Sequence, residues 1–366
     1  MNNELLYQLA LTLTPNIGDV HSKALINIYG NVSDIFKAPL HQLEKIEGIG
    51  RIRAKSIKSF ADFSVCENEI RFLEKEKITP VFMTDEIYPQ RLLHCYDSPP
   101  LLFFKGNAHL NARKIVSIVG TRSNSEYGRQ MCEKLVEELS RQNVTVVSGL
   151  AFGIDTIAHK SAVKNNLPTI AVLAHGLDRI YPSQNKYLAK EMQEYGGLLT
   201  DFRSGTSPDK QNFPRRNRIV AGICDALIVV ESNRRGGSLI TAEIAGSYHK
   251  DVFAVPGRAS DIKSEGCNYL IKNNKATMIT SADDILQEMN WSPKPPASKK
   301  QQQQLYIEFS QSEKILLNIL QESSPAEVDE LYRRSGLSSG VVAEALLMLE
   351  MQGVVQSLPG KKYQVS

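Results

Sequence analysis

The feature that most constrains the fold of this chain is a series of short apolar segments, each followed by a loop with small residues and then by a helical pattern. These segments are Lys114 to Val119, Val144 to Val147, Thr169 to Leu173, Ala226 to Val230 and Val252 to Val255. Short continuous apolar runs that alternate with helices are typical of parallel strands covered on both faces. We therefore predict an α/β fold whose core is a Rossmann-like parallel sheet.

The loops at the ends of these strands carry the residues with the clearest chemistry. Gly120-Thr121-Arg122 follows the first strand, residues 148–155 follow the second, and residues 236–241 open the helix after the fourth. Ligands of open parallel sheets bind beyond the carboxyl ends of the strands. Glycine lets a backbone approach a ligand closely, and the N–H groups at a helix start attract anions. Together the loops predict a site for phosphate groups or a nucleic-acid backbone.

A basic segment lies between residues 207 and 222. Lys210, Arg215, Arg216 and Arg218 are close together there, with Asn217 among them. A helix that starts after Pro214 would place Arg215 and Arg218 roughly on one face. The group either adds cations to the anion site or, in the case of Arg218, forms a structural ion pair beside the apolar residues that follow it.

Other ligand classes are not expected. The chain has neither a Gly-Lys-Ser/Thr loop nor a complete Gly-x-Gly-x-x-Gly motif, which argues against ATP and NAD. Its five cysteines are scattered without a Cys-x-x-Cys pair, so neither a disulfide scaffold nor a zinc site is predicted. His159 and His175 lack a Ser–His–Asp arrangement and are expected to pack or to form hydrogen bonds. We therefore expect no cofactor, no metal and no catalytic residue.

Composition sets the expected domains. The stretch WSPKPPASKKQQQQ from Trp291 has little that a core could bury, which is typical of an exposed linker. We expect a helical domain at 1–84, the sheet domain at 85–290, the linker at 291–304 and a small domain at 305–366.

The net charge of +3, from 43 basic and 40 acidic residues, excludes a histone-like polycation but allows a local basic groove. No apolar run approaches the ~20 residues of a membrane helix, and the N-terminus lacks a signal-peptide pattern, so we expect a cytoplasmic protein with no membrane partner.

The first region contains an internal repeat. Residues 16–20, NIGDV, resemble residues 48–52, GIGRI, and each copy lies between two helical stretches. Residues 43–57 resemble a helix-hairpin-helix, as in SAM-like helical domains, in which a glycine turn exposes helix N–H groups to a DNA phosphate. The alternative is a packing unit without DNA contact, because the first copy lacks the leading glycine and Asp19 would repel a phosphate.

The last region has the pattern of a winged helix. Residues 312–321 fit an amphipathic helix, Ser324 and Pro325 are expected to begin a second helix, and Ser338 or Ser339 is expected to cap a third. Residues 354–356 and 362–365 then fit a two-stranded wing. The third helix has no arginine or lysine and carries two glutamates, which would oppose phosphates. A protein contact or a regulatory role is therefore favoured over DNA recognition by this domain.

Several motifs resemble the DprA/Smf DNA-processing family. They occur in order over residues 85–280: Tyr88-Pro89, Pro99 to Leu102, Ile118 to Arg122, Ser148 to Ala151, Gly153-Ile154-Asp155, Ala158-His159, Tyr181-Pro182, Phe213-Pro214, Arg216 to Ile219, Gly237 to Thr241, and Val255-Pro256-Gly257. The family usually has arginine or lysine where this chain has Phe152, which removes a cation and offers a surface for base stacking. It usually has serine where this chain has Gly236.

The resemblance implies a non-enzymatic, single-stranded DNA-binding recombination mediator that protects incoming DNA and loads RecA during natural transformation. It also implies a homodimer formed through the Rossmann-like domain. The residues expected to contact DNA are Gly120, Thr121, Arg122, Ser148, Gly149, Phe152, Gly153, Lys186, Lys210, Arg215, Arg216, Asn217, Arg218, Gly237, Ser238 and Thr241.

Two other functions are alternatives. Gly236-Gly237 with Thr241 and Glu243 is similar to the loop of cytokinin-activating phosphoribohydrolases, Rossmann-fold enzymes, which would make Glu243 act on a ribosyl bond while Arg122 holds the phosphate. The loop lacks that family's second glycine before Thr241. The other alternative is a sequence-specific regulator that reads DNA with the winged helix, and the acidic third helix argues against it.

Overall fold

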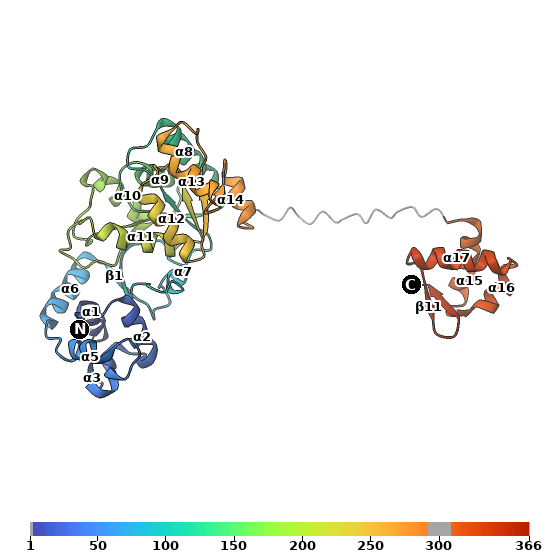
Figure 1. The fold of residues 1–366 in the computed structure, drawn as a ribbon, viewed down its shortest axis with the longest axis horizontal. Helices are drawn as coiled ribbons and strands as arrows, with labels where there is room; N and C mark the ends of the chain where they lie inside the picture. Colours follow the sequence, from blue (N-terminus) through green and yellow to red (C-terminus); the bar gives the residue numbers. More distant parts are fainter. Residues whose placement is uncertain (1–2, 292–308, 366) are drawn as a thin grey trace. The chain divides into compact units, whose positions relative to one another are not determined.

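The computed structural model describes residues 3–291 and 309–365, which belong to two compact units, 1–292 and 293–366 (Figure 1). All of the expected linker except Trp291 lies outside the described residues. Within those two ranges, no helix is both long enough and apolar enough to cross a membrane.

The first unit begins with a helical region. Its two repeat copies each lie between helices, with α1 and α2 around the first turn and α4 and α5 around the second. Gly48 and Gly50 have φ values of 79° and 57°, in the left-handed region that favours glycine, so the second turn depends on these residues. The helices are α1 (Asn3–Leu13), α2 (Asp19–Tyr29), α3 (Val32–Lys37), α4 (Leu40–Glu44), α5 (Gly50–Lys58) and α6 (Phe63–Glu76).

A nine-stranded sheet forms the centre of the first unit, in the order β1-β2-β6-β5-β4-β3-β7-β8-β9. Strand β2 pairs antiparallel with β1 and β6, and all other neighbouring strands are parallel. The predicted parallel core is confirmed, because the five apolar segments form β3, β4, β5, β7 and β8. The strands are β1 (Thr79–Phe82), β2 (Leu101–Gly106), β3 (Ile115–Val119), β4 (Thr145–Ser148), β5 (Thr169–Val172), β6 (Gly197–Thr200), β7 (Ala226–Val229), β8 (Asp251–Ala254) and β9 (Thr277–Met278).

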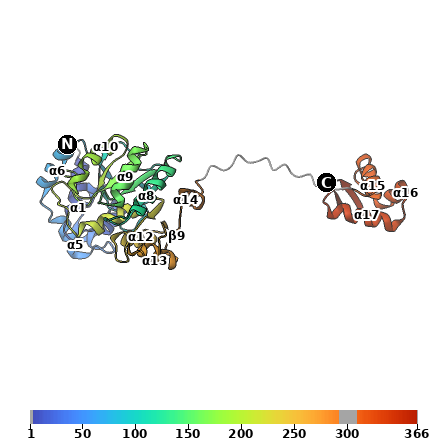
Figure 2. The ribbon, with the colours of Figure 1, turned by 90° about the horizontal axis from the view of Figure 1, so that it is seen from above.

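Helices cover both faces of this sheet (Figure 2). One face packs against α8, α9, α10 and α14, and the other against α11, α12 and α13. The second face shares one apolar cluster with the helical region, which includes Leu25 of α2 and Val229 of β7. These helices are α7 (Gln90–Leu93), α8 (Glu126–Ser140), α9 (Ile154–Lys164), α10 (Lys186–Tyr195), α11 (Asn212–Gly222), α12 (Gly237–Ser247), α13 (Glu265–Lys272) and α14 (Ala282–Glu288), with short 3-10 turns at Ser183–Asn185 and Ile262–Ser264.

Two details of the first unit differ from the expectations. Helix α11 begins at Asn212 rather than after Pro214, and the proline lies in its first turn, where its missing N–H is not needed. Strand β1 ends at Phe82 and is already part of the sheet, so the sheet begins before the boundary expected at residue 84. The division into separate domains at that residue stays a prediction.

The second unit is a winged helix, as predicted. It contains α15 (Gln311–Glu322), α16 (Val328–Ser335), α17 (Ser339–Met351) and a sheet of β10 (Ala326–Glu327), β12 (Lys362–Val365) and β11 (Val355–Leu358). The expected start of the second helix at Ser324-Pro325 is wrong. Ala326 and Glu327 instead pair with Tyr363 and Lys362 of β12, so the helix begins at Val328.

Candidate nucleic-acid interface

A cavity of about 650 Å³ lies at the carboxyl ends of β3, β4 and β7, and we refer to it as the main cavity. The loops after these three strands and the start of α11 form its walls. The structure brings many of the predicted site residues together here. Those that line it are Gly120, Thr121, Arg122, Lys210, Arg216, Asn217, Gly237, Ser238 and Thr241.

Three of the predicted glycines bring the loops into contact with one another. A Cβ atom on Gly153 would lie 2.2 Å from the Thr121 carbonyl oxygen, and one on Gly120 would lie 2.5 Å from Ile154. A Cβ on Gly149 would lie 2.6 Å from the Arg216 guanidinium. These glycines therefore permit contacts inside the protein, where we had expected close approach of a ligand. Gly237 is different, because its Cβ position has no atom within 4 Å, so the start of α12 is open.

Two buried side chains of opposite charge, Arg216 and Asp155, support the loop after β4. Arg216 Nη1 donates to the carbonyl oxygen of Gly149 at 2.6 Å and also to that of Val172. Asp155 Oδ2 accepts from the backbone N–H groups of Gly149 at 3.2 Å and Ala151 at 3.3 Å. Burial raises the pKa of Asp155 and lowers the pKa of Arg216 to about 10, while the attraction between the two charges opposes both shifts. These two side chains fix the loop, and they use much of their hydrogen-bonding capacity inside the protein.

Exposed cations surround the main cavity. Arg122, Lys210 and Arg235 are exposed, and among the described residues none of them forms an ion pair. The Arg122 guanidinium lies over the ring of Phe213, 5.1 Å from its centroid. Arg235 was not among the residues predicted from the sequence, although two arginines directly before a glycine turn at a strand end are a recognisable signal. The cavity thus offers three side chains that are free to meet anions.

Aromatic side chains adjoin these cations. A smaller cavity next to the main one is lined by Phe152, Tyr181 and Phe213, and Arg122, Ala151, Phe213 and Arg216 line both. The Phe152 and Tyr181 side chains are 44% and 47% exposed, so their rings are accessible to a flat ligand. Phe152 was predicted from the sequence as a stacking residue, whereas Tyr181 and Phe213 were not among the predicted contacts. Exposed rings beside cations are the combination found in proteins that bind single strands.

The two histidines near these loops have structural roles. His159 is buried, with Nδ1 2.7 Å from Thr169 Oγ1. His175 Nε2 accepts from the Tyr181 N–H at 3.2 Å, and its Nδ1 lies 2.9 Å from the Gly176 carbonyl oxygen. Burial lowers the pKa of both side chains, so both are neutral at pH 7.

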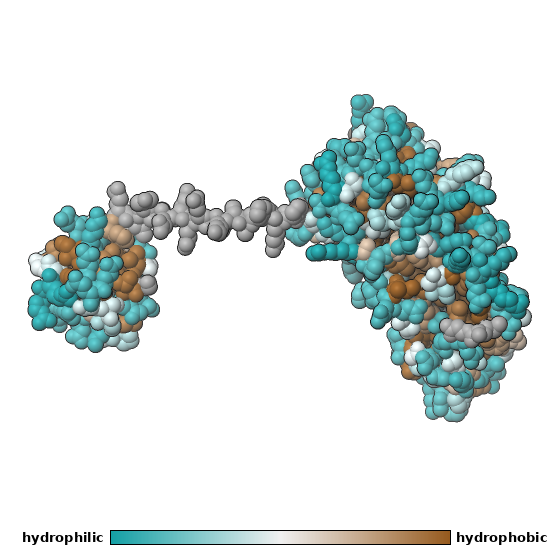
Figure 3. Space-filling model, turned by 180° about the vertical axis from the view of Figure 1, so that it is seen from behind, coloured by the Kyte–Doolittle hydropathy of each residue, from teal (hydrophilic) through white to brown (hydrophobic). Residues whose placement is uncertain are grey.

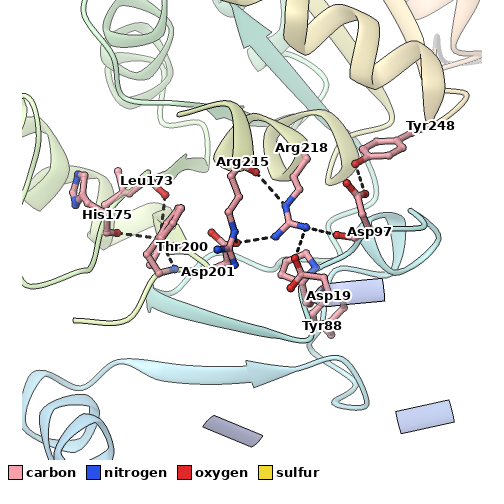
Figure 4. Close-up of polar contacts among 12 residues, drawn as sticks. Asp19, Tyr88, Asp97, Leu173, His175, Thr200, Asp201, Arg215, Arg218 and Tyr248 are labelled. Carbon is pink, nitrogen blue, oxygen red and sulfur yellow. Dashed lines mark hydrogen bonds and ion pairs between the residues drawn. The ribbon is translucent and has the colours of Figure 1, made fainter. Parts of the chain in front are cut away.

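Other members of the predicted set lie elsewhere. Arg218 donates to Asp19 at 2.7 Å, to Asp201 at 2.9 Å and to the Asp97 carbonyl oxygen (Figure 4). Arg215 is exposed but pairs with the same Asp201. These contacts show Arg218 as the structural ion pair that we had considered as its alternative role. The predicted residues that line neither cavity are Ser148, Gly153, Lys186, Arg215 and Arg218.

The first repeat copy packs against the α/β part of the unit. Asp19, at the start of α2, pairs with Arg218, and Lys23 donates to the carbonyl oxygens of Leu93 and Cys95. This helix start is therefore engaged inside the protein, as the packing alternative describes. In the second copy, Arg53 donates to the carbonyl oxygens of Asn16 and Gly48, and DNA contact there stays a prediction.

The third helix of the winged unit presents apolar side chains to solvent. Val341, Leu347, Met348 and Met351 of α17 are exposed, and the second unit shows hydrophobic patches in Figure 3. Together with the absence of lysine and arginine from this helix, they support a protein contact, which also stays a prediction.

Comparison with known proteins identifies the family. Residues 79–290 match the family model of DNA recombination-mediator protein A, and residues 292–361 match that of the DprA winged helix domain. The chain belongs to the DprA/Smf family of DNA recombination mediators. Protein Smf of Synechocystis sp. is 32% identical to it over 99% of each chain. DNA processing protein DprA of Streptococcus pneumoniae is 41% identical over 63% of this chain and 86% of its own.

Solved structures of DprA proteins share the fold. The X-ray structure of DprA from Streptococcus pneumoniae has a TM-score of 0.68 at 35% identity and covers 77% of this chain and 97% of that one. A structure that describes the single-stranded DNA binding mode of DNA processing protein A from Helicobacter pylori has a TM-score of 0.53 at 28% identity. It covers 58% of this chain and 96% of that one.

Proposed function

We propose that this DprA/Smf chain binds single-stranded DNA in the main cavity and acts there as a recombination mediator. The observation that carries the proposal is the group of exposed cations, Arg122, Lys210 and Arg235, which form no ion pair within the described ranges and lie beside the exposed rings of Phe152 and Tyr181. Cations can hold the phosphates while the rings stack on bases, and neither contact depends on base identity. The single-strand binding of the Helicobacter pylori relative supports the same ligand.

The site residues have two roles in the function that we propose. Arg122, Lys210 and Arg235 contact phosphates, and the open N–H groups of Gly237 and Ser238 at the start of α12 add donors. Gly120, Gly149, Gly153 and Arg216 hold the loops in place. The exposed Lys186 at the start of α10 extends the positive surface.

The position of Glu243 supports a binding function over ribosyl hydrolysis. Its carboxylate is exposed on α12, pairs with Lys275 at 3.3 Å and does not line the main cavity. The buried carboxylate that does line the cavity, Asp155, is engaged with two backbone N–H groups. The proposal therefore includes no catalytic step.

The family resemblance extends the proposal to partners. The bound strand is protected from nucleases and passed to RecA, and two chains associate through the sheet-containing unit. We expect the purified protein to have twice the mass of one chain in solution and to speed RecA assembly on a single strand. A monomer that has no effect on RecA would contradict this extension without contradicting the proposal that the chain binds single-stranded DNA.

A titration with three ligands tests the DNA-binding proposal. A fluorescent oligothymidylate, a duplex of equal length and a nucleoside monophosphate are added to the full chain over a range of salt concentrations. We expect the single strand to bind best, with log K falling against log salt by ~0.7 for each phosphate contact. A flat salt response would contradict the phosphate contacts, and release of a free base from the monophosphate would support the hydrolase.

A further inference from the structure

We propose that the exposed side of α17 in the second unit binds an amphipathic helix of another protein, one whose apolar side is bordered by lysines or arginines. This inference goes beyond the proposed function and does not depend on DNA binding. The residues concerned, which we call the α17 face, are Val341, Glu344, Leu347, Met348 and Met351.

Helix α17 is apolar on its outer side as well as on its inner side. The core of the second unit contains its inner residues Val342, Ala345, Leu346 and Leu349. On the outer side, the side chains of Leu347 and Met351 are 57% and 76% exposed. Within residues 309–365, every large apolar side chain that is exposed lies on α17. A helix that is apolar all round is normally covered on all sides, so this outer side has the character of an interaction surface.

The spacing of the α17 face fits a second helix. Intervals of three and four residues place four of its members in one row along α17, namely Val341, Glu344, Met348 and Met351. The row is ~15 Å long, or roughly three helical turns. The two methionine side chains are flexible and can adapt their shape to a partner. An amphipathic helix with apolar residues at the same spacing would therefore pack along the row.

The charge of the α17 face indicates which helix would bind. Glu344 and Glu350 lie one turn before and one turn after Leu347, and neither carboxylate forms an ion pair with a residue that the structure describes. Helix α17 itself has no lysine or arginine. Arg334 and Lys362, in the same unit, already pair with other glutamates. A partner that places cations beside its apolar residues would complement both carboxylates.

Other occupants fit this face less well. Helices α16 and α17 form a helix-turn-helix whose second helix would read DNA, but Glu344 and Glu350 oppose phosphates. The same two charges oppose anionic lipid headgroups, which attract helices with a basic polar side. Two copies of α17 would bring four glutamates together without a cation on either helix. A basic amphipathic helix is the occupant that matches both the apolar row and the charge.

A designed peptide tests the docking site on the full chain. The probe is a fluorescent peptide of leucine, alanine and lysine, roughly four helical turns long, with its leucines on one side. A second peptide has glutamate in place of every lysine and the same apolar side. We expect the lysine peptide to bind at least about tenfold more tightly in fluorescence anisotropy, because its cations meet Glu344 and Glu350. Added salt should narrow this difference.

Surface variants assign the binding to the α17 face. Met351→Gln should weaken the lysine peptide about tenfold, because it removes an apolar side chain from the contact. Glu344→Gln should weaken it about two- to fivefold, as for an exposed charge pair. Ile28→Gln on α2 and Asp329→Asn on α16 replace another exposed apolar residue and another exposed carboxylate, and both should bind like the parent. All four side chains are exposed, so the melting midpoints should match that of the parent.

The remaining outcomes each contradict the proposal or separate it from DNA binding. If neither peptide binds, or if Met351→Gln binds the lysine peptide as tightly as Ile28→Gln does, the α17 face is not the docking site. Equal affinity for the two peptides would make the expected charge of the partner wrong. If the parent binds no peptide and has a higher mass in solution than Met351→Gln, the face holds a second copy of this chain instead. A parent that binds the lysine peptide but no oligothymidylate would contradict the proposed function alone.

Discussion

At the scale of single residues, the loop glycines are where the fold and the site are most tightly connected. Gly153 has φ +77°, and a side chain there would collide with the backbone of Thr121 and Arg122. We expect Gly153→Ala to lower the free energy of unfolding by ~1–3 kcal/mol, the usual cost of such backbone strain. Gly237→Ala, whose Cβ would meet nothing within 4 Å, is the matched control. Equal urea-unfolding midpoints for the two variants would contradict this contact between the loops.

Buried His159 predicts how stability depends on pH. Burial lowers the pKa of His159 from 6.5 to about 3, so the folded chain stays neutral there while the unfolded chain takes up a proton below about 6.5. The contribution of neutral His159 to the free energy of unfolding is complete above about pH 6.5 and is lost as the pH falls toward 3. Between pH 7.5 and 5.5 we expect the parent to lose ~1 kcal/mol more than His159→Gln in urea unfolding. Parallel pH profiles for the two proteins would show that His159 is not the group responsible.

The sequence located the site residues but could not assign their roles. Arg122 follows a strand and a glycine, which was enough to place it at the carboxyl edge of the sheet. Arg216 and Arg218 come from the same basic segment, yet both are buried and bind partners far away in the chain, such as Gly149 and Asp19. Such partners depend on the tertiary fold, and no local pattern shows them.

At the scale of elements, short buried runs that are mostly apolar identified five strands of the sheet. The strands β3, β4, β5, β7 and β8 are buried at every position except Asp251, and they were recognised. Strand β9 is exposed at both of its residues and β1 is buried only in its second half, whereas β2 and β6 are largely buried and were still not predicted, so burial alone did not identify every strand. The start of α16 was misplaced for a related reason, because β10 exists through its pairing with the distant β12.

Arg218 joins three elements, which gives a prediction at this scale. It lies on α11 and binds Asp19 at the start of α2 and Asp201 directly after β6. We expect Arg218→Ala to destabilise the chain by ~3–5 kcal/mol, because it leaves the buried Asp201 with only the exposed Arg215 and removes the cation that pairs with Asp19. Arg215→Ala removes an exposed partner of Asp201 and should cost ~1 kcal/mol or less. Chemical unfolding measures both, and a stable Arg218→Ala protein with weakened DNA binding would restore Arg218 to the DNA site.

At the scale of the whole molecule, the residues proposed to bind DNA all belong to the first unit. The first unit contains its own core and every residue that lines the main cavity. We therefore expect deletion of residues 292–366 to leave a folded protein with the single-strand affinity of the full chain. Circular dichroism and the oligothymidylate titration check this, and loss of most of the affinity would make the winged helix a primary DNA contact.

The central claim is that the intact chain holds DNA phosphates in the main cavity through Arg122. The measurement that tests it most directly is the single-strand affinity of Arg122→Ala together with its melting midpoint. Arg122 is exposed and its guanidinium stacks on Phe213, so we expect an unchanged midpoint and binding weaker by ~1.5–3 kcal/mol, about tenfold to a hundredfold. Arg122→Lys should recover part of the loss, since lysine cannot hold a phosphate with two parallel hydrogen bonds. Parent-like binding by Arg122→Ala, or a midpoint that falls together with the affinity, would contradict the claim.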